Sequence, residues 1–177
     1  MRLLFLYGPP AVGKLTVAKL LARRSGYVLF HNQLTVDLAQ QIFPWGSAEY
    51  VDLVDRLRLE IMQRAAKAEV SGMIFTFVYA HPLDLPFVRK VQRVLRRHDG
   101  STHFYQLTCQ REDLFQRVKQ DSRRDHEKIR TKKTLQRVLD RYDLHTAIPR
   151  TESLLVDTSR LRPAAAAELI WRDARKT

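Results

Sequence analysis

The sequence predicts an α/β fold built around a mostly parallel β-sheet. Five short apolar runs alternate with longer stretches whose apolar residues recur every three or four positions, as in amphipathic helices. Several runs are apolar at nearly every position, as strands buried on both faces are. Because strands that alternate with helices form sheets covered on both faces, we expect a three-layer sandwich with a five-stranded parallel sheet, in one domain over residues 1–177.

The predicted strands are rich in aliphatic, β-branched and aromatic residues. They cover residues 2–7, 27–30, 73–78, 103–109 and 153–158. The third of them, "MIFTFV", is apolar at nearly every position and is therefore expected to be buried on both faces. No linker, repeat or low-complexity segment interrupts the pattern, so nothing in the sequence divides the chain.

The predicted helices carry recognisable start and stop signals. They cover residues 13–24, 34–42, 47–70 and 82–98, a region before the last strand, and the end of the chain. Gly26 is expected as a helix C-terminal glycine, Ser47 as an N-cap and Pro163 in a first turn. The long helix from Ser47 is expected to bury one face, formed by Tyr50, Val54, Leu57, Ile61, Ala65 and Ala68.

The composition is basic, with 31 Lys and Arg against 19 Asp and Glu and a formal net charge of +12. Such a balance suits nucleotides, phosphorylated substrates or nucleic acid, although a basic solvated surface accounts for it equally well. Cys109 is the only cysteine, which excludes an intrachain disulfide and a cysteine metal cage. No apolar run approaches the roughly 20 residues of a membrane span, so we expect a cytoplasmic protein without a membrane partner.

The stretch "LYGPPAVGKLT" has the spacing of a phosphate-binding loop between a strand and a helix. Gly8 and Gly13 allow the backbone to bend sharply, so that amide groups at the positive end of the following helix point toward phosphates. Lys14 is placed to reach the outer phosphates and to neutralise charge during transfer. The nucleotide-binding residues predicted here are Gly8, Pro9, Pro10, Ala11, Val12, Gly13, Lys14, Leu15 and Thr16.

Leu15 stands where such a loop usually has a Ser or Thr that binds Mg²⁺. Thr16 is rotated about 100° further around the helix and does not simply replace that hydroxyl. We expect Mg²⁺ to be held mainly by nucleotide phosphates and water, as it commonly keeps several waters. Thr16 and Asp37 are the candidate protein ligands.

The loop and the alternating pattern around it resemble the P-loop kinase superfamily. The similar branches are the small nucleoside, nucleotide and shikimate kinase-like enzymes and the chloramphenicol phosphotransferase-type enzymes. The resemblance extends over the whole chain as a pattern and is specific around residues 8–16. It implies a P-loop NTPase fold with a lid, ATP and Mg²⁺ as cofactors, and phosphate transfer to a small molecule.

Two later stretches resemble further parts of these kinases. Residues 114–130 are rich in basic side chains and resemble the lid, at about residues 117–131. The resemblance implies that Arg117 packs on the nucleotide base and that Arg123 and Arg124 are catalytic, whereas a solvated helix with internal ion pairs is the alternative. Asp157 and Ser159 resemble the adenine-side loop, but either would equally serve as an N-cap before the last helix.

The acceptor side departs from the family pattern. Relatives carry an Asp, often Asp-x-Asp, after the second strand, where this sequence reads "FHNQLTVD". Asp37 is the first-choice general base and His31 the second, although His31 serves equally well as a structural residue of the turn. Arg58, like other arginines of the long helix, is expected to attract an anionic acceptor or only water, and Tyr79 is expected to face the cleft.

The function predicted from the sequence is an ATP-dependent phosphotransferase acting on a small molecule, most simply a nucleoside or nucleotide. The net charge of +12 favours a polynucleotide end as an alternative acceptor. Leu15 and the missing Asp-x-Asp favour a second alternative, a nucleotide-binding module without kinase activity. The oligomeric state is not predicted.

Overall fold

The computed structural model describes residues 1–119, 129 and 131–176. Within them, five strands form one parallel sheet in the order β2-β3-β1-β4-β5. The strands are β1 (Arg2–Tyr7), β2 (Val28–His31), β3 (Gly72–Phe77), β4 (Ser101–Thr108) and β5 (Ser153–Asp157). The predicted five-stranded parallel sheet is therefore confirmed.

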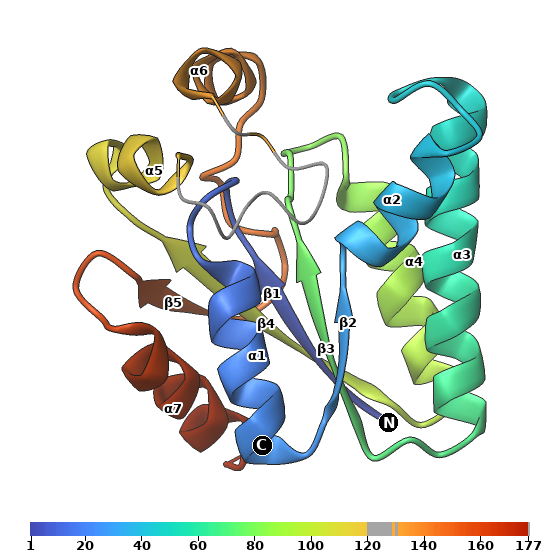
Figure 1. Cartoon of the computed structure of the whole chain (residues 1–177). Helices are drawn as coiled ribbons and strands as arrows, with labels where there is room; N and C mark the ends of the chain where they lie inside the picture. Colours follow the sequence, from blue (N-terminus) through green and yellow to red (C-terminus); the bar gives the residue numbers. More distant parts are fainter. Residues whose placement is uncertain (120–128, 130, 177) are drawn as a thin grey trace.

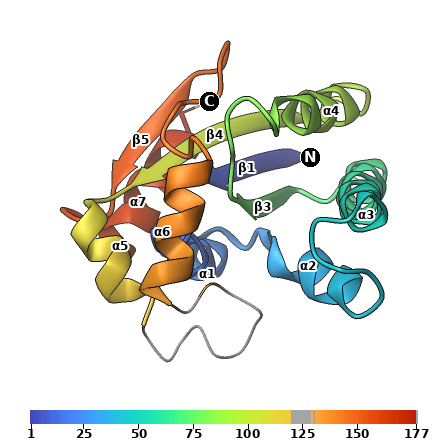
Figure 2. The same cartoon turned by 90° about the horizontal axis from the view of Figure 1, so that it is seen from above.

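Helices cover both faces of the sheet, and further helices lie at the carboxyl ends of its strands (Figures 1 and 2). One face packs against α1 (Lys14–Ser25) and α7 (Pro163–Ala174), and the other against α3 (Ala48–Lys67) and α4 (Leu85–Arg96). The shorter α2 (Gln33–Gln40) packs on α3, while α5 (Arg111–Arg117) and α6 (Lys132–Arg141) lie beyond the carboxyl ends of the strands. This arrangement is the three-layer sandwich that the alternating pattern predicts.

The apolar side chains of the central strand β1 are buried on both faces of the sheet. Leu4 and Leu6 belong to the core shared with α1 and α7, and the alternate residues Leu3, Phe5 and Tyr7 belong to the core shared with α3 and α4. All five are at most 1% exposed. Because successive side chains of a strand point to opposite faces, a strand apolar at every position needs helices on both.

The predicted helix signals at Gly26 and Ser47 are confirmed, whereas the alternative of Asp157 or Ser159 as N-cap of the last helix is wrong, because the N-cap of α7 is Arg162. Gly26 ends α1 with φ of 73°, and its N–H donates to the Ala22 carbonyl at 2.9 Å. The Ser47 side chain accepts a hydrogen bond of 3.2 Å from the Tyr50 amide at the start of α3. None of the helices in the described part of the chain combines the length and the apolar character that crossing a bilayer requires.

The predicted apolar face of α3 is wrong beyond its second turn. Tyr50 and Val54 are buried as expected, but the buried face continues through Arg58, Met62 and Ala66. Ile61, which was assigned to that face, is 39% exposed. The buried residues recur every four positions, so Arg58 falls in the middle of the buried face. A prediction that places every arginine on the surface therefore moves the expected face by one position, from Met62 to Ile61.

Candidate active site

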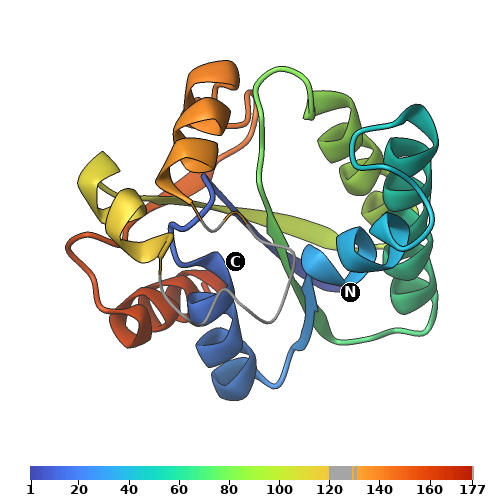
Figure 3. The same ribbon diagram turned by 45° about the horizontal axis from the view of Figure 1, so that its top comes forward.

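The candidate site lies at the edge of the sheet where all five parallel strands end. The glycine loop, residues 8–13, follows β1, and the turn into α2 follows β2. Figures 1 and 3 show α5 and α6 on one side of this loop and α2 and α3 on the other. Ligands of open α/β sheets bind outside the carboxyl ends of the strands, so this edge is the expected place for a nucleotide and its acceptor.

The glycines of the loop are required by its geometry. Gly8 has φ of 144°, and a Cβ built on it would overlap the carbonyl oxygen of Leu107 in β4. Gly13 is the N-cap of α1 with φ of 99°, a conformation that favours glycine. Ala11 also has a positive φ, 68°, which is uncommon for a residue with a Cβ.

The Lys14 side chain lies against the loop that precedes it in the sequence. Its Nζ donates to the carbonyl oxygens of Gly8 at 2.8 Å and Pro9 at 2.7 Å. The ammonium group therefore lies at the mouth of the loop, beside the N-terminus of α1. The first amides of a helix have no intrahelical acceptor, so a phosphate at this place meets amide donors, the helix dipole and Lys14 together.

A buried network fixes the loop from the side of β5. The Thr158 Oγ1 lies 2.9 Å from the carbonyl oxygen of Val12 and 3.0 Å from that of Thr108. Arg117 donates to Thr158 at Oγ1 (3.0 Å) and at the carbonyl oxygen (2.8 Å), and also to the Val12 carbonyl at 3.4 Å. Arg117 is thus beside the glycine loop, while Thr158, which the sequence did not single out, joins the two.

The neighbours of Thr158 contact α5 and their own turn rather than the glycine loop. Asp157 Oδ1 accepts from the Ser159 amide at 2.9 Å, and its Oδ2 forms an ion pair with Arg160 at 3.3 Å. Ser159 Oγ donates to Asp113 Oδ2 at 2.5 Å and accepts from the Gln110 amide at 2.8 Å. These contacts give both residues a structural role, and nucleotide binding by Asp157 and Ser159 stays a prediction.

The two predicted general bases lie on either side of the turn from β2 into α2. His31 is the last residue of β2 and is paired in register with Thr76 of β3. Asp37 is half-buried in α2, and its Oδ1 accepts a hydrogen bond of 3.2 Å from Gln33. Since β3 separates β2 from β1 and neighbouring strands are about 4.8 Å apart, the end of β2 is about 10 Å from the end of β1.

The catalytic arginines predicted for the lid, Arg123 and Arg124, lie outside the described residues, as does most of the lid predicted over residues 117–131. Their roles stay predictions. Within the described part, Arg117 is the only one of the three predicted arginines whose contacts are known, and these contacts join α5 to the glycine loop.

The described residues do not form a protein-built magnesium site. Leu15 has no oxygen to offer, and the side chain of Thr16 is exposed. Nowhere in residues 1–119, 129 and 131–176 do three or more His, Cys, Asp or Glu side chains gather as a metal cluster. This donor set fits an ion held chiefly by a nucleotide, and ligation by Thr16 or Asp37 stays a prediction.

The loop after β3 is packed into the fold rather than open to the site. Tyr79 is 1% exposed and stacks edge-on against Tyr7 at 5.8 Å, so the expectation that it faces the cleft is wrong. The Tyr79 hydroxyl lies 3.0 Å from Nδ1 of His81. Further on, burial raises the pKa of the Asp84 carboxyl, which accepts a hydrogen bond of 2.7 Å from the Ala80 amide.

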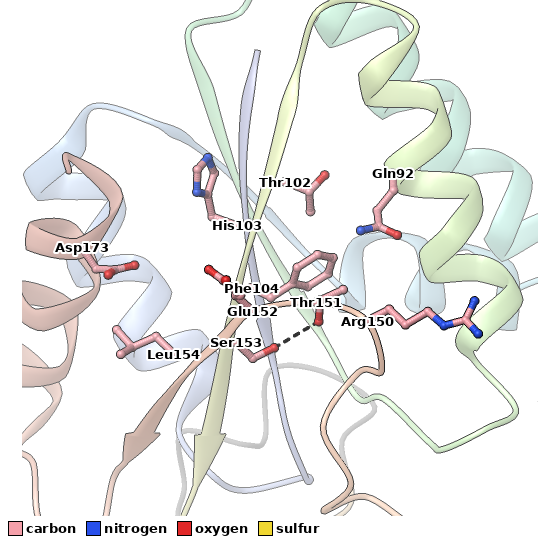
Figure 4. A pocket seen from close by; sticks show the side chains of 10 residues that line it. All are labelled: Gln92, Thr102, His103, Phe104, Arg150, Thr151, Glu152, Ser153, Leu154 and Asp173. Atoms are coloured by element: carbon pink, nitrogen blue, oxygen red, sulfur yellow. Dashed lines mark hydrogen bonds between the residues drawn. The ribbon is translucent and has the colours of Figure 1, made fainter. Parts of the chain in front are cut away.

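A separate cavity lies where β4 and β5 begin, at the opposite edge of the sheet from the glycine loop. It has a volume of about 540 Å³ and is lined mainly by polar side chains, among them Thr102, Arg150 and Asp173 (Figure 4). A hydrogen bond of 3.4 Å joins Thr151 to Ser153 beside it. None of the predicted site residues lines this cavity, so it is distinct from the candidate active site.

Solved structures resemble this chain along nearly its whole length. A sugar kinase from Janibacter sp. HTCC2649 matches with a TM-score of 0.68 at 21% identity, covering 98% of this chain and 95% of that chain. The tunicamycin resistance protein of Deinococcus radiodurans matches with a TM-score of 0.63 at 18% identity, covering 99% and 96%. A gluconokinase from Sinorhizobium meliloti 1021 matches with a TM-score of 0.62 at 16% identity, covering 99% and 94%.

The chain has the fold of the small P-loop kinases. The sequence matches no protein-family model and no curated protein. At these identities the likeness is one of fold, and it confirms the P-loop kinase resemblance predicted from the glycine loop at that level. Any reaction that is proposed for this chain therefore depends on the side chains that it places on this fold.

Proposed function

We propose that this protein is an ATP-dependent phosphotransferase that moves the γ-phosphate of ATP to a hydroxyl group of a small molecule. The observation that carries the proposal is the glycine loop with Lys14. A Cβ on Gly8 would overlap β4, Gly13 begins α1 with a positive φ, and Lys14 lies against the loop carbonyls. Phosphoryl transfer depends mainly on positioning and on neutralising charge, which this arrangement provides.

The proposed step forms one bond and breaks one. The acceptor oxygen bonds to the γ-phosphorus while the bond from that phosphorus to the β–γ bridging oxygen breaks, and ADP leaves with the electron pair. The hydroxyl proton passes to Asp37 as first choice or to His31 as second. Mg²⁺ is proposed to bind together with the nucleotide, and Thr16 and Asp37 are its candidate protein ligands.

The acceptor is proposed to be a hydroxylated small molecule. Nucleosides and nucleotides are candidates from the sequence, and the structural neighbours include a sugar kinase, a gluconokinase and a shikimate kinase. A polynucleotide end is favoured by the net charge of +12 alone. The first compounds to test are therefore sugars, sugar acids, shikimate, nucleosides and nucleoside monophosphates.

The experiment incubates the full chain with ATP and Mg²⁺ and each acceptor in turn, and measures ADP release and the mass of the product. One acceptor class should raise ADP release above the rate with water and gain the mass of one phosphate. An oligonucleotide with a 5′-hydroxyl belongs in the panel, measured at about 50 and about 200 mM salt, because a polyanion loses affinity steeply with salt. ATP binding without any acceptor-dependent turnover would identify a nucleotide-binding module instead.

A further inference from the structure

Arg58 is a buried cation in the middle of α3. The residue is 5% exposed, and its guanidinium carbon lies 5.4, 5.7 and 6.0 Å from the ring centres of Phe77, Phe87 and Phe75. A guanidinium over aromatic rings is stabilised by cation–π attraction. Burial alone does not explain its presence, since the core position that it occupies would accept an apolar residue.

The polar contacts of Arg58 lead to the turn between β2 and α2. Its Nε donates to Thr35 Oγ1 at 3.1 Å, and its NH2 group donates to Asn32 Oδ1 at 2.5 Å. The Thr35 hydroxyl in turn donates to the backbone carbonyl of Asn32 at 3.1 Å, and the backbone N–H of Asn32 donates to Thr76 Oγ1 of β3 at 3.2 Å. Arg58 therefore connects α3 to a turn that is also anchored on β3.

The charge of Arg58 is balanced inside the protein. Asp55 lies 3.8 Å away on the same helix, and desolvation lowers the pKa of the guanidinium to about 10 while Asp55, Tyr50 and Asp84 act in the opposite direction. Arg58 thus remains charged at neutral pH. Because a buried charge is costly without partners, the contacts with Asn32 and Thr35 are ones that the fold must keep.

We propose that Arg58 is a positioning residue of the acceptor side, which fixes the turn between β2, which ends at His31, and α2, which carries Asp37. This inference rests on the proposed function, because the turn matters for catalysis only if it holds the acceptor or its proton. It also changes the expected role of Arg58. Its guanidinium is engaged by Asn32, Thr35 and Asp55 and does not serve to attract an anionic acceptor.

Asn32 acquires a role from this contact. It stands in the segment where related kinases carry acids, and its neutral amide oxygen accepts from Arg58. A carboxylate at this position would pair with Arg58 and would be neutralised by it, so it would not be a free base. The proposed bases remain Asp37, in α2, and His31, at the end of β2.

The test compares variants of Arg58 with a matched control on the same helix. Arg58→Met replaces the buried cation by an apolar side chain of similar length that can rest on the phenylalanine rings. The double variant Arg58→Met with Asn32→Leu also removes Asn32 Oδ1, the partner with the shortest hydrogen bond among those that the first change leaves behind. Arg56→Met is the control, because Arg56 is exposed and its only ion pair among the described residues is with Asp52 on the surface of α3.

Two readouts do not depend on an identified acceptor. Hydrogen exchange of the peptide around residues 31–37 reports whether the turn is held, and turnover of ATP with water as the acceptor gives kcat and KM. We expect Arg58→Met to speed exchange in this peptide and to lower kcat at least about 10-fold while KM for ATP stays the same, since small misplacements of reacting groups have effects of this size. The unfolding temperature should fall in the single variant and recover in the double variant without recovery of kcat.

The outcomes separate the positioning role from simple stabilisation. Recovery of kcat together with the unfolding temperature in the double variant would show that Arg58 only stabilises the fold, and unchanged exchange in the turn would overturn the inference directly. A wild-type protein that binds no ATP would instead contradict the proposed function. The exchange experiment would still decide whether Arg58 fixes the turn.

Discussion

At the nucleotide side, the backbone itself forms the site: Gly8 fits under the Leu107 carbonyl, Gly13 begins α1, and the lysine that follows lies on the loop. At the acceptor side, side chains from three elements meet instead. Arg58 of α3 holds Asn32 and Thr35, and β3 holds the same turn through Thr76. The first arrangement depends on residues adjacent in sequence, and the second on residues far apart.

This difference decides what each side tolerates. A loop that binds through amides needs only the right φ angles and room for the chain, so Leu15 can follow Lys14 without harming the cradle. A turn held by side chains tolerates a change at one contact only if the partner changes as well. We therefore expect single substitutions at the nucleotide side to act through glycine geometry and Lys14, and those at the acceptor side to act in pairs.

The largest effect is expected for Lys14→Ala. Removing the ammonium group at the loop mouth removes charge neutralisation during transfer, so turnover of ATP should fall by about 10²- to 10³-fold. Steady-state ADP release measures it, and circular dichroism checks the fold. Lys19→Ala, on the exposed face of the same helix, should leave turnover unchanged. Equal rates for the two variants would mean that this loop does not bind the reacting phosphates.

Gly8→Ala should destabilise the protein more than Gly13→Ala does. The Cβ at position 8 would overlap the Leu107 carbonyl, which costs about 2–3 kcal/mol of unfolding free energy if the chain has to shift. At position 13 no atom lies within 4 Å of the added Cβ, so only the positive φ is unfavourable, by about 1 kcal/mol. Urea unfolding measures both values, and the reverse order would argue against the close approach of the loop to β4.

Thr158→Val tests the contact between β5 and the glycine loop. The change keeps the shape of the side chain but removes the oxygen that lies 2.9 Å from the Val12 carbonyl and 3.0 Å from Arg117. A buried polar group left without its partner costs about 1–3 kcal/mol, and we expect KM for ATP to rise as well.

Ser159→Ala is the comparison for Thr158→Val. Ser159 contacts Asp113 and Gln110 rather than the loop, so this variant should lower stability without raising KM. A rise in KM of equal size in both variants would support a direct nucleotide contact for Ser159. It would also mean that the Val12 contact is not what positions the loop.

The sequence was sufficient for the fold and for the glycine loop because both depend on local patterns. Alternating strands and helices specify a parallel sheet, and the spacing of Gly8, Gly13 and Lys14 specifies a loop between β1 and α1. The helix signals at Gly26 and Ser47 are equally local, and both are confirmed. Thr158 lies between two residues that were singled out, but only the pairing of β5 with β4 brings it to the loop.

The acceptor side could not be predicted because its organising residue violates the burial pattern. Arg58 falls on the buried face of α3, and a reading that reserves buried positions for apolar residues assigns Ile61 in place of Met62. Its partners Asn32 and Thr35 are 26 and 23 residues away along the chain. No periodicity or motif links residues that meet only after α3 has packed on β3.

The smallest effect is expected for Asp143→Asn, which removes a charge from the segment after α6. Hydrogen bonds from the Thr146 hydroxyl and from the amides of Thr146 and His145 lower the pKa of the Asp143 carboxyl to about 2. Because this value is below that of an unfolded Asp, about 3.9, the charged form contributes stability above about pH 4 and loses it as the pH falls toward about 2. The group is exposed, so solvent screening keeps the contribution small.

Denaturant unfolding of the wild type and of Asp143→Asn at several pH values measures this contribution. The wild type should be slightly more stable at pH 7, and the difference should shrink between about pH 4 and about pH 2. ATP binding should not change, because Asp143 meets His81 through its backbone carbonyl at 2.8 Å, and that bond survives the substitution. A difference that stays constant with pH would show that the amide replaces the carboxylate poorly for reasons of shape.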